Sequence, residues 1–186
     1  MLGALADIAA SFGFSASAGL NAYLTMLIVA LAARFTSLIR LNPPFDGLTN
    51  GWVIGLLAVL TLVEALADKI PAFDTAYNVL QTLVRPVAGA VLFAASSKVI
   101  GNVHPVLALA CGVVVAGVVH TAKTAARPVL TAVSGGTANP VVSTAEDIVA
   151  ATTTIVSIVV PILALVMILI GAWLIFRVFQ RVRADA

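Results

Sequence analysis

Two acidic side chains in the segment LVEALADK have the spacing to handle ions or protons. Glu64 and Asp68 are four residues apart, so a helix would place both carboxylates on one face. They repel each other unless a cation or a proton lies between them, and Lys69 and Arg85 are the nearest cations. Glu64 also lies inside an apolar run, where a carboxylate is costly unless it is paired or neutralised. We therefore expect Glu64 and Asp68 to serve in ion or proton coupling.

A second group of charges follows in the segments VVHTAKTAAR and STAED. His120, Lys123 and Arg127 are spaced by three and four residues, so one helix face would present a titratable imidazole and two cations. We expect the two cations to bind substrate, and His120, Glu146 and Asp147 to couple ions or protons. The simpler alternatives are an interfacial histidine, cations that reach the lipid headgroups, and acids that stabilise a helix N-terminus.

Two stretches of small residues, GFSASAGLNAYL and SGGTANPVVSTAED, each contain an asparagine and then return to an apolar run. Such stretches interrupt a helix and leave N–H and C=O groups unpaired, which hydrocarbon tolerates only where protein or a water-filled cavity covers them. The N–H groups carry partial positive charge and would bind an anion together with nearby cations. The predicted substrate site consists of Asn21, Asn139, Arg85, Lys123 and Arg127.

The composition indicates that these groups lie in a membrane. The 186 residues are 61% hydrophobic and 10% charged, and the mean hydropathy is +1.13, outside the usual range of soluble domains. A net charge of +2 gives no argument for nucleic acid as a partner. Cys111 stands in an apolar run, where we interpret it as a packing residue. No HExxH, GxSxG or two-carboxylate metal motif occurs, so the sequence favours neither an enzyme nor a metal or cofactor site.

Apolar stretches of about 20 residues can each cross roughly 30 Å of hydrocarbon. The sequence therefore predicts an all-α fold, a single polytopic membrane bundle of five to six spans with two broken or re-entrant segments. Residues 1–20 would form a short or re-entrant segment without the basic start of a cleaved leader, and Pro161 would kink the last span. The candidate spans are residues 21–38, 51–67, 78–96, 104–121 and 148–176, followed by a basic tail at 177–186.

The basic tail sets the predicted orientation. Its three arginines favour the cytoplasm by the positive-inside rule, which places the chain in a cell membrane with its C-terminus inside. Counting back through five spans places Arg40 and Lys98 on the cytoplasmic side. The same count places both groups of charges on the outer side, so nearly all the unusual polar residues would share one half of the membrane.

Two pairs of short, similar sequence segments suggest a weak internal repeat. ADK and LVRPVAGAV in the first half correspond to TAK and AARPVLTAV in the second, although the spacing inside each pair differs. Both follow a span of the same predicted direction, which would make the repeat parallel. In repeat-built transporters the substrate site lies between the repeats, so the two asparagine breaks would then meet.

Four segments resemble a known family: SAGLNAYL, WVIGLLAVLTLVEALADKIPAFD, LQTLVRPVAGAVLFA and GGTANPVVSTAED. They resemble the bacterial integral-membrane proteins catalogued as domain of unknown function 4126, and the resemblance covers most of the chain. It implies a helical membrane fold and names no substrate.

Two functions from different classes fit these features. The first is a small permease or channel-like transporter for a small or anionic solute, an ion or a lipid headgroup. The second is a non-transporting scaffold or partner subunit whose polar groups hold another membrane protein. A chain of this length has few helices with which to enclose a path, so in either case we expect a homo-oligomer in contact with membrane lipids.

Overall fold

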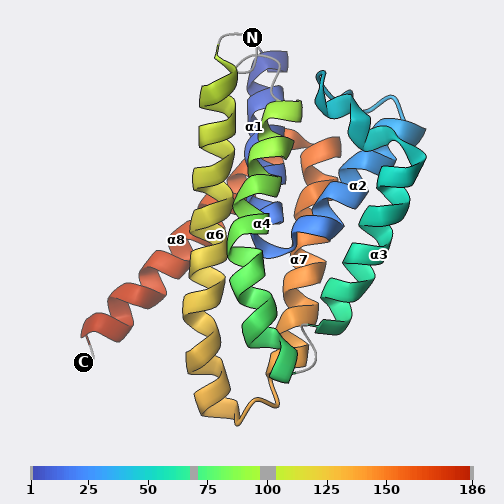
Figure 1. Ribbon diagram of the computed structural model, residues 1–186. Helices are drawn as coiled ribbons and strands as arrows, with labels where there is room; N and C mark the ends of the chain where they lie inside the picture. The colour runs from blue at the N-terminus through green and yellow to red at the C-terminus, as the bar shows by residue number, and fades with distance from the viewer. Residues whose placement is uncertain (1, 68–70, 97–103, 185–186) are drawn as a thin grey trace.

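The computed structural model describes residues 2–67, 71–96 and 104–184, and over these residues the chain is helical with no strand (Figure 1). The predicted all-α fold is therefore confirmed for this part of the chain. The helices are α1 (Leu2–Leu20), α2 (Ala22–Phe35), the 3-10 helix η1 (Phe45–Thr49), α3 (Gly51–Ala67), α4 (Pro71–Ser96), α6 (Pro105–Ser134), α7 (Asn139–Val159) and α8 (Pro161–Ala184).

Helices α1 and α2 form a broken pair that turns back inside the bundle. In Figure 1, α1 runs from the upper end of the bundle to its mid-height, and α2 returns from there to the upper end. Asn21 makes the break because its backbone is extended, with φ −145° and ψ 107°. Its backbone N–H donates to the Ser17 carbonyl at 3.0 Å, and its side-chain oxygen accepts from the Leu24 N–H at 2.9 Å. One residue thus ends α1 and caps α2.

The later helices run between the two ends of the bundle. In Figure 1, α3 descends, α4 ascends, α6 descends and α7 ascends, and α8 then slopes down and away from the bundle. The upper end therefore holds the start of α1, η1 and the α7–α8 junction, and the lower end holds the α6–α7 connection. Between α4 and α6, Gly89 and Gly112 let the backbones approach, since a Cβ atom on Gly112 would overlap the Gly89 carbonyl.

Apolar side chains cover much of the outside of the bundle. Trp52, Leu83 and Val133, for example, are each more than 70% exposed. Within the described residues, α6 and α7 are the two helices long and apolar enough to cross a bilayer. Shorter apolar helical stretches lie at Ala22–Phe35, Gly51–Ala67, Leu80–Ser96 and Pro161–Trp173.

The span expected over residues 148–176 is divided between two helices. We expected a kink at Pro161, but α7 ends at Val159 and α8 begins at Pro161. The break follows from proline, which has no N–H for the helical hydrogen bond and whose ring clashes with the preceding turn. The chain therefore reverses direction between α7 and α8, where a single kinked span was expected. Arg40 lines a cavity with Asp7 at the upper end, and α8 descends from that same end. In the structure Arg40 therefore lies at the end of the bundle from which α8 leads away, and Lys98 lies outside the described residues.

The second small-residue stretch is a connection at the lower end of the bundle rather than a break within it (Figure 1). Gly135 and Gly136 have φ values of 59° and 85°, in the left-handed region that favours glycine, and they end α6. Asn139 then begins α7. The two asparagines therefore do not meet, because one breaks a helix at mid-height and the other stands at one end.

The proposed parallel repeat is also not found. The Arg-Pro dipeptides of the two similar segments, Arg85-Pro86 and Arg127-Pro128, lie inside α4 and α6. These two helices run in opposite directions in Figure 1, so a parallel duplication does not relate them. What the two segments share in the structure is a buried arginine that pairs with a carboxylate.

Candidate functional site

A fully buried ion pair joins α3 to α4. Arg85 Nη2 donates to Glu64 Oε1 at 2.9 Å, and both side chains are 0% exposed. Taking two charges out of water costs several kcal/mol per ion, and their attraction offsets this only when the geometry is good and further hydrogen bonds are made. A buried pair is therefore weak evidence for stability, and within a membrane it is a candidate for ion or proton handling.

The ion pair continues into α6 through His120. Arg85 Nη1 lies 3.3 Å from His120 Nδ1, and His120 Nε2 lies 3.3 Å from Thr82 Oγ1. An arginine can only donate, so Nδ1 accepts and the ring proton lies on Nε2, which donates to the threonine hydroxyl. A continuous chain of polar atoms therefore runs from Glu64 through Arg85 and His120 to Thr82.

Helices α6 and α7 contribute a second group of charges. Glu146 Oε2 accepts from Lys123 Nζ at 2.9 Å and from Arg127 Nη2 at 2.8 Å. Lys123 and Arg127 are four residues apart on α6, so both cations face the same side of that helix. Their side chains are only 2% and 8% exposed. The predicted alternative, in which both reach the lipid headgroups, therefore does not describe their positions.

These charges stabilise the helix break at Asn21. Lys123 Nζ donates to the carbonyl of Leu20, the last residue of α1, at 3.0 Å. Asn21 Nδ2 donates to Asp147 Oδ1 at 2.8 Å, which places a carboxylate beside the start of α2. A cation at a helix C-terminus and an anion near an N-terminus both complement the helix dipole. The unpaired backbone of the break is thus covered by protein, as a bilayer requires.

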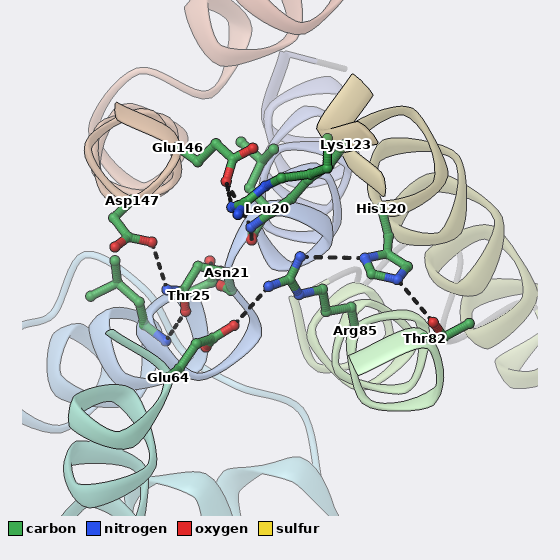
Figure 2. Close-up of polar contacts among 12 residues, drawn as sticks. Leu20, Asn21, Thr25, Glu64, Thr82, Arg85, His120, Lys123, Glu146 and Asp147 are labelled. Carbon is green, nitrogen blue, oxygen red and sulfur yellow. Dashed lines mark hydrogen bonds and ion pairs between the residues drawn. The ribbon is translucent and has the colours of Figure 1, made fainter. Parts of the chain in front are cut away.

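Figure 2 shows that these side chains converge from α2, α3, α4, α6 and α7 around the end of α1. We call this set the charged network: Asn21, Glu64, Arg85, His120, Lys123, Arg127, Glu146 and Asp147. Its three cations, Arg85, Lys123 and Arg127, are matched by three carboxylates, Glu64, Glu146 and Asp147. Formal charge therefore balances in the network, which offers an anion less net attraction than the sequence suggested.

Several buried polar atoms near the network have no hydrogen-bond partner among the residues that the structure describes. They are both amide atoms of Gln81, Nε of Arg85 and Oγ of Ser17. Gln81 and Arg85 are four residues apart, so they share one face of α4, and both are 0% exposed. A buried polar group without a partner costs about 1 to 3 kcal/mol. These atoms include both donors and an acceptor whose hydrogen bonds the described residues do not supply.

Eight of the ten predicted site residues meet, one lies apart, and one lies outside the described residues. All eight members of the charged network were predicted from the sequence. Asn139 lies apart, where its side chain is hydrogen-bonded to Thr131 Oγ1. Asp68 lies outside the described residues. Sequence reasoning missed Gln81, Ser17, Thr82 and the Leu20 carbonyl, although the spacing of Gln81 and Arg85 could have indicated a shared face.

The simpler alternatives for His120, Glu146 and Asp147 also do not describe their positions. His120 is buried in the interior of α6, away from either end of that helix. Glu146 and Asp147 were candidates for the first turn of a helix. Because α7 begins at Asn139, they lie two turns inside it, beyond the reach of a capping role.

No group of three or more His, Cys, Asp or Glu side chains in the described residues could hold a metal ion. No curated protein and no solved structure matches the chain. One family model does match, described as "Domain of unknown function (DUF4126)", over residues 8–181. This match spans nearly the whole chain, including both ends of the charged network. The chain therefore belongs to the family of domain of unknown function 4126, as the resemblance of its four segments implied.

Proposed function

We propose that this protein is a multi-pass permease that moves a small polar solute across the cell membrane past the charged network. The observation that carries the proposal is the fully buried Glu64–Arg85 pair beside a helix break at mid-height of the bundle. Transporters place substrate and coupling-ion sites near the membrane midplane, at helices interrupted in this way. In this proposal α1 and α2 form a re-entrant pair, and the longer helices complete a bundle of five to six spans.

The apolar outer surface supports the membrane location. Side chains such as Trp52, Leu83 and Val133 would be unfavourable in water, and lipid or further copies of the chain would cover them. The three arginines of the tail favour the cytoplasm. Because α8 descends toward the lower side of Figure 1, the lower end would be cytoplasmic and the upper end would face outward.

Cysteine labelling tests this orientation. In a background with Cys111→Ala, Gly47→Cys in η1 should react with a membrane-impermeant thiol reagent added to intact cells. Thr137→Cys in the α6–α7 connection should react only after the cells are opened. Both positions are exposed, so accessibility within the protein does not differ between them. Labelling of Thr137→Cys in intact cells with protection of Gly47→Cys would reverse the orientation.

The network favours an uncharged or zwitterionic solute over a simple anion. Its cations are already paired with carboxylates, so an anion would have to displace one of them. Gln81, in contrast, offers an amide with both donor and acceptor atoms available. Arg85 Nε adds one further donor on the same face of α4. A molecule with both N–H or O–H donors and carbonyl or carboxylate acceptors would satisfy this set.

Glu64 is the group best placed to couple transport to protons. A proton on its carboxylate would remove the attraction that holds Arg85 Nη2. Arg85 also contacts His120, so its guanidinium could move toward the solute without leaving the network. In this mechanism a proton on Glu64 releases Arg85 to bind the solute, so the proton and the solute are bound at the same time and would move together.

A scaffold role does not explain the buried Glu64–Arg85 pair or the buried amide of Gln81. Holding a partner protein requires polar groups at the surface, whereas Glu64, Gln81 and Arg85 are 0% exposed. A buried ion pair and a buried amide with unused hydrogen bonds both cost stability. Such costs are expected where a solute or a proton completes the site, so the permease is the better explanation.

Solute entry into vesicles tests the proposed function. Liposomes that contain the purified protein are shrunk by hyperosmotic urea, glycine or potassium phosphate, and light scattering follows their re-swelling as solute enters. We expect urea or glycine to enter at least about tenfold faster than into protein-free liposomes, equivalent to a barrier lower by about 1.4 kcal/mol. If a proton accompanies glycine, its entry should also acidify a lumenal pH dye.

Two results would contradict the proposal. The permease proposal would be contradicted if the protein is folded and all three probes enter at the rate of protein-free liposomes. Entry of phosphate alone would retain a transporter but overturn the assignment of an uncharged or zwitterionic solute.

A further inference from the structure

A polar cavity lies at the upper end of the bundle, away from the charged network. Its volume is about 220 Å³, and it lies between α1, the segment after α2, the end of α4 and the α7–α8 junction. Polar side chains on its lining are Asp7, Arg40, Ser96 and Ser157. Drug-sized ligands occupy pockets of about 300 to 1,000 Å³, so a cavity of this volume suits a smaller molecule.

The polar groups of the cavity favour a molecule with hydrogen-bond donors. Ser157 Oγ donates to the Thr153 carbonyl at 2.6 Å, and Ser96 Oγ donates to the Leu92 carbonyl at 2.7 Å. The hydroxyl hydrogens are therefore engaged, and the oxygen lone pairs can accept from a molecule in the cavity. The Asp7 carboxylate is another acceptor. Amine, amide and hydroxyl groups would bind here, and Arg40 could pair with a carboxylate on the same molecule.

One face of α1 connects this cavity to the helix break. Ala10 and Phe14 line the cavity, and the same face of α1 continues at four-residue spacing to Ala18, one turn from the break at Asn21. Phe14, Ala18 and Ala22 belong to a buried apolar cluster. The other buried members of that cluster are Val29, Ala88 and Leu92, and Val84, which precedes Arg85, packs against it.

The apolar cluster thus separates two polar compartments. On its upper side is the cavity, and on its lower side are Asn21 and Arg85 of the charged network. Three of the cluster's buried residues are alanines. Among the described residues, Phe14 is the one aromatic side chain that belongs to the cluster and also lines the cavity, and it is 0% exposed; the partly buried Ile39 and Ile158 line the cavity and pack against the cluster beside it. Movement of this ring would therefore remove the largest buried side chain between the cavity and the cluster.

We infer that the cavity is an outward-facing binding site for the same small donor-bearing solute, and that Phe14 closes the route from it to the charged network. This inference rests on the proposed transport function. The solute enters from the upper end, binds between the serine hydroxyls and Asp7, and passes along the Ala10–Ala18 face of α1 when the Phe14 ring moves aside.

The experiment compares two phenylalanines of α1 in the vesicle assay with urea and glycine. Phe14→Ala should increase the entry rate of both probes at least about tenfold over the parent protein, because it removes the barrier between the compartments. Phe12→Ala is the control, since Phe12 packs edge-to-face on Phe93 with ring centroids 5.1 Å apart and does not line the cavity. Its entry rates should remain those of the parent.

A second variant keeps the test independent of whether Phe14→Ala folds. Ala10→Trp should fill the cavity and reduce entry of both probes to the rate of protein-free liposomes. Ala58→Trp on the exposed face of α3 is its control and should transport as the parent does. Equal rates for the parent, Phe14→Ala and Ala10→Trp would overturn this inference and leave the permease standing. A parent and a Phe14→Ala protein that both admit no probe would overturn the two together.

Discussion

Replacing Arg85 by leucine should lower the free energy of unfolding by about 3 to 5 kcal/mol, because the Glu64 carboxylate would stay buried without its guanidinium. Glu64→Leu alone should also lower the free energy of unfolding, because Arg85 would then stay buried without its carboxylate. The double variant should be far more stable than the sum of the two changes, since no charge then remains in the buried pair. Thermal unfolding of the four proteins in detergent measures this coupling, and vesicle entry should be lost in the double variant despite its stability.

Arg177→Leu is the matched control for the loss of an arginine. Arg177 is exposed on α8, with its guanidinium 4.6 Å from the centre of the Trp173 ring. Surface substitutions usually change stability by less than about 0.5 kcal/mol, so its thermal midpoint should stay close to that of the parent. Equal midpoints for Arg85→Leu and Arg177→Leu would show that the Glu64–Arg85 pair is not buried as described.

The partners in the charged network could be anticipated from sequence because the physics leaves few choices. A carboxylate within an apolar run must be paired, and Arg85 was one of two cations close enough in sequence to pair with Glu64. Helical spacing likewise places Lys123 and Arg127 on one face. Composition left two fold classes, since a chain with so few polar residues can satisfy its backbone in lipid only by helices or a closed barrel, and apolar stretches of about 20 residues then favoured helices.

Positions along the bundle could not be predicted in the same way. A stretch rich in Gly, Ser and Asn has the same composition whether it breaks a helix at mid-height or connects two helices at one end. Asn21 and Asn139 therefore appeared equivalent, and only their neighbours distinguish them: Asp147 and Lys123 cover the first break, whereas Asn139 contacts Thr131. The break at Val160 was missed because a proline is compatible with either a kink or an end.

Gln81 was missed for a different reason. A glutamine in a helix is usually a surface residue, and no local pattern shows that neither of its amide atoms has a partner among the residues the structure describes. That property depends on α4 being packed against helices from distant parts of the sequence. The residue that best distinguishes a transport site from a structural network therefore emerges only from the three-dimensional arrangement.

Replacing Gln81 by leucine should raise the free energy of unfolding by about 1 to 3 kcal/mol, because it removes a buried amide for which the described part of the chain supplies no hydrogen-bond partner. Leucine has a similar volume, so the packing of α4 should change little. The same variant should lose solute entry, since the proposed binding group is gone. Gln180→Leu, at an exposed position of α8, is the control and should change neither property.

The most direct test of the central claim is the rate of glycine and urea entry into liposomes that contain Gln81→Leu, measured beside the parent and Gln180→Leu. The account predicts a variant that melts at a higher temperature than the parent and admits both probes no faster than protein-free liposomes. A Gln81→Leu protein that melts lower and transports as the parent does would contradict it, because Gln81 would then be a structural residue that holds water.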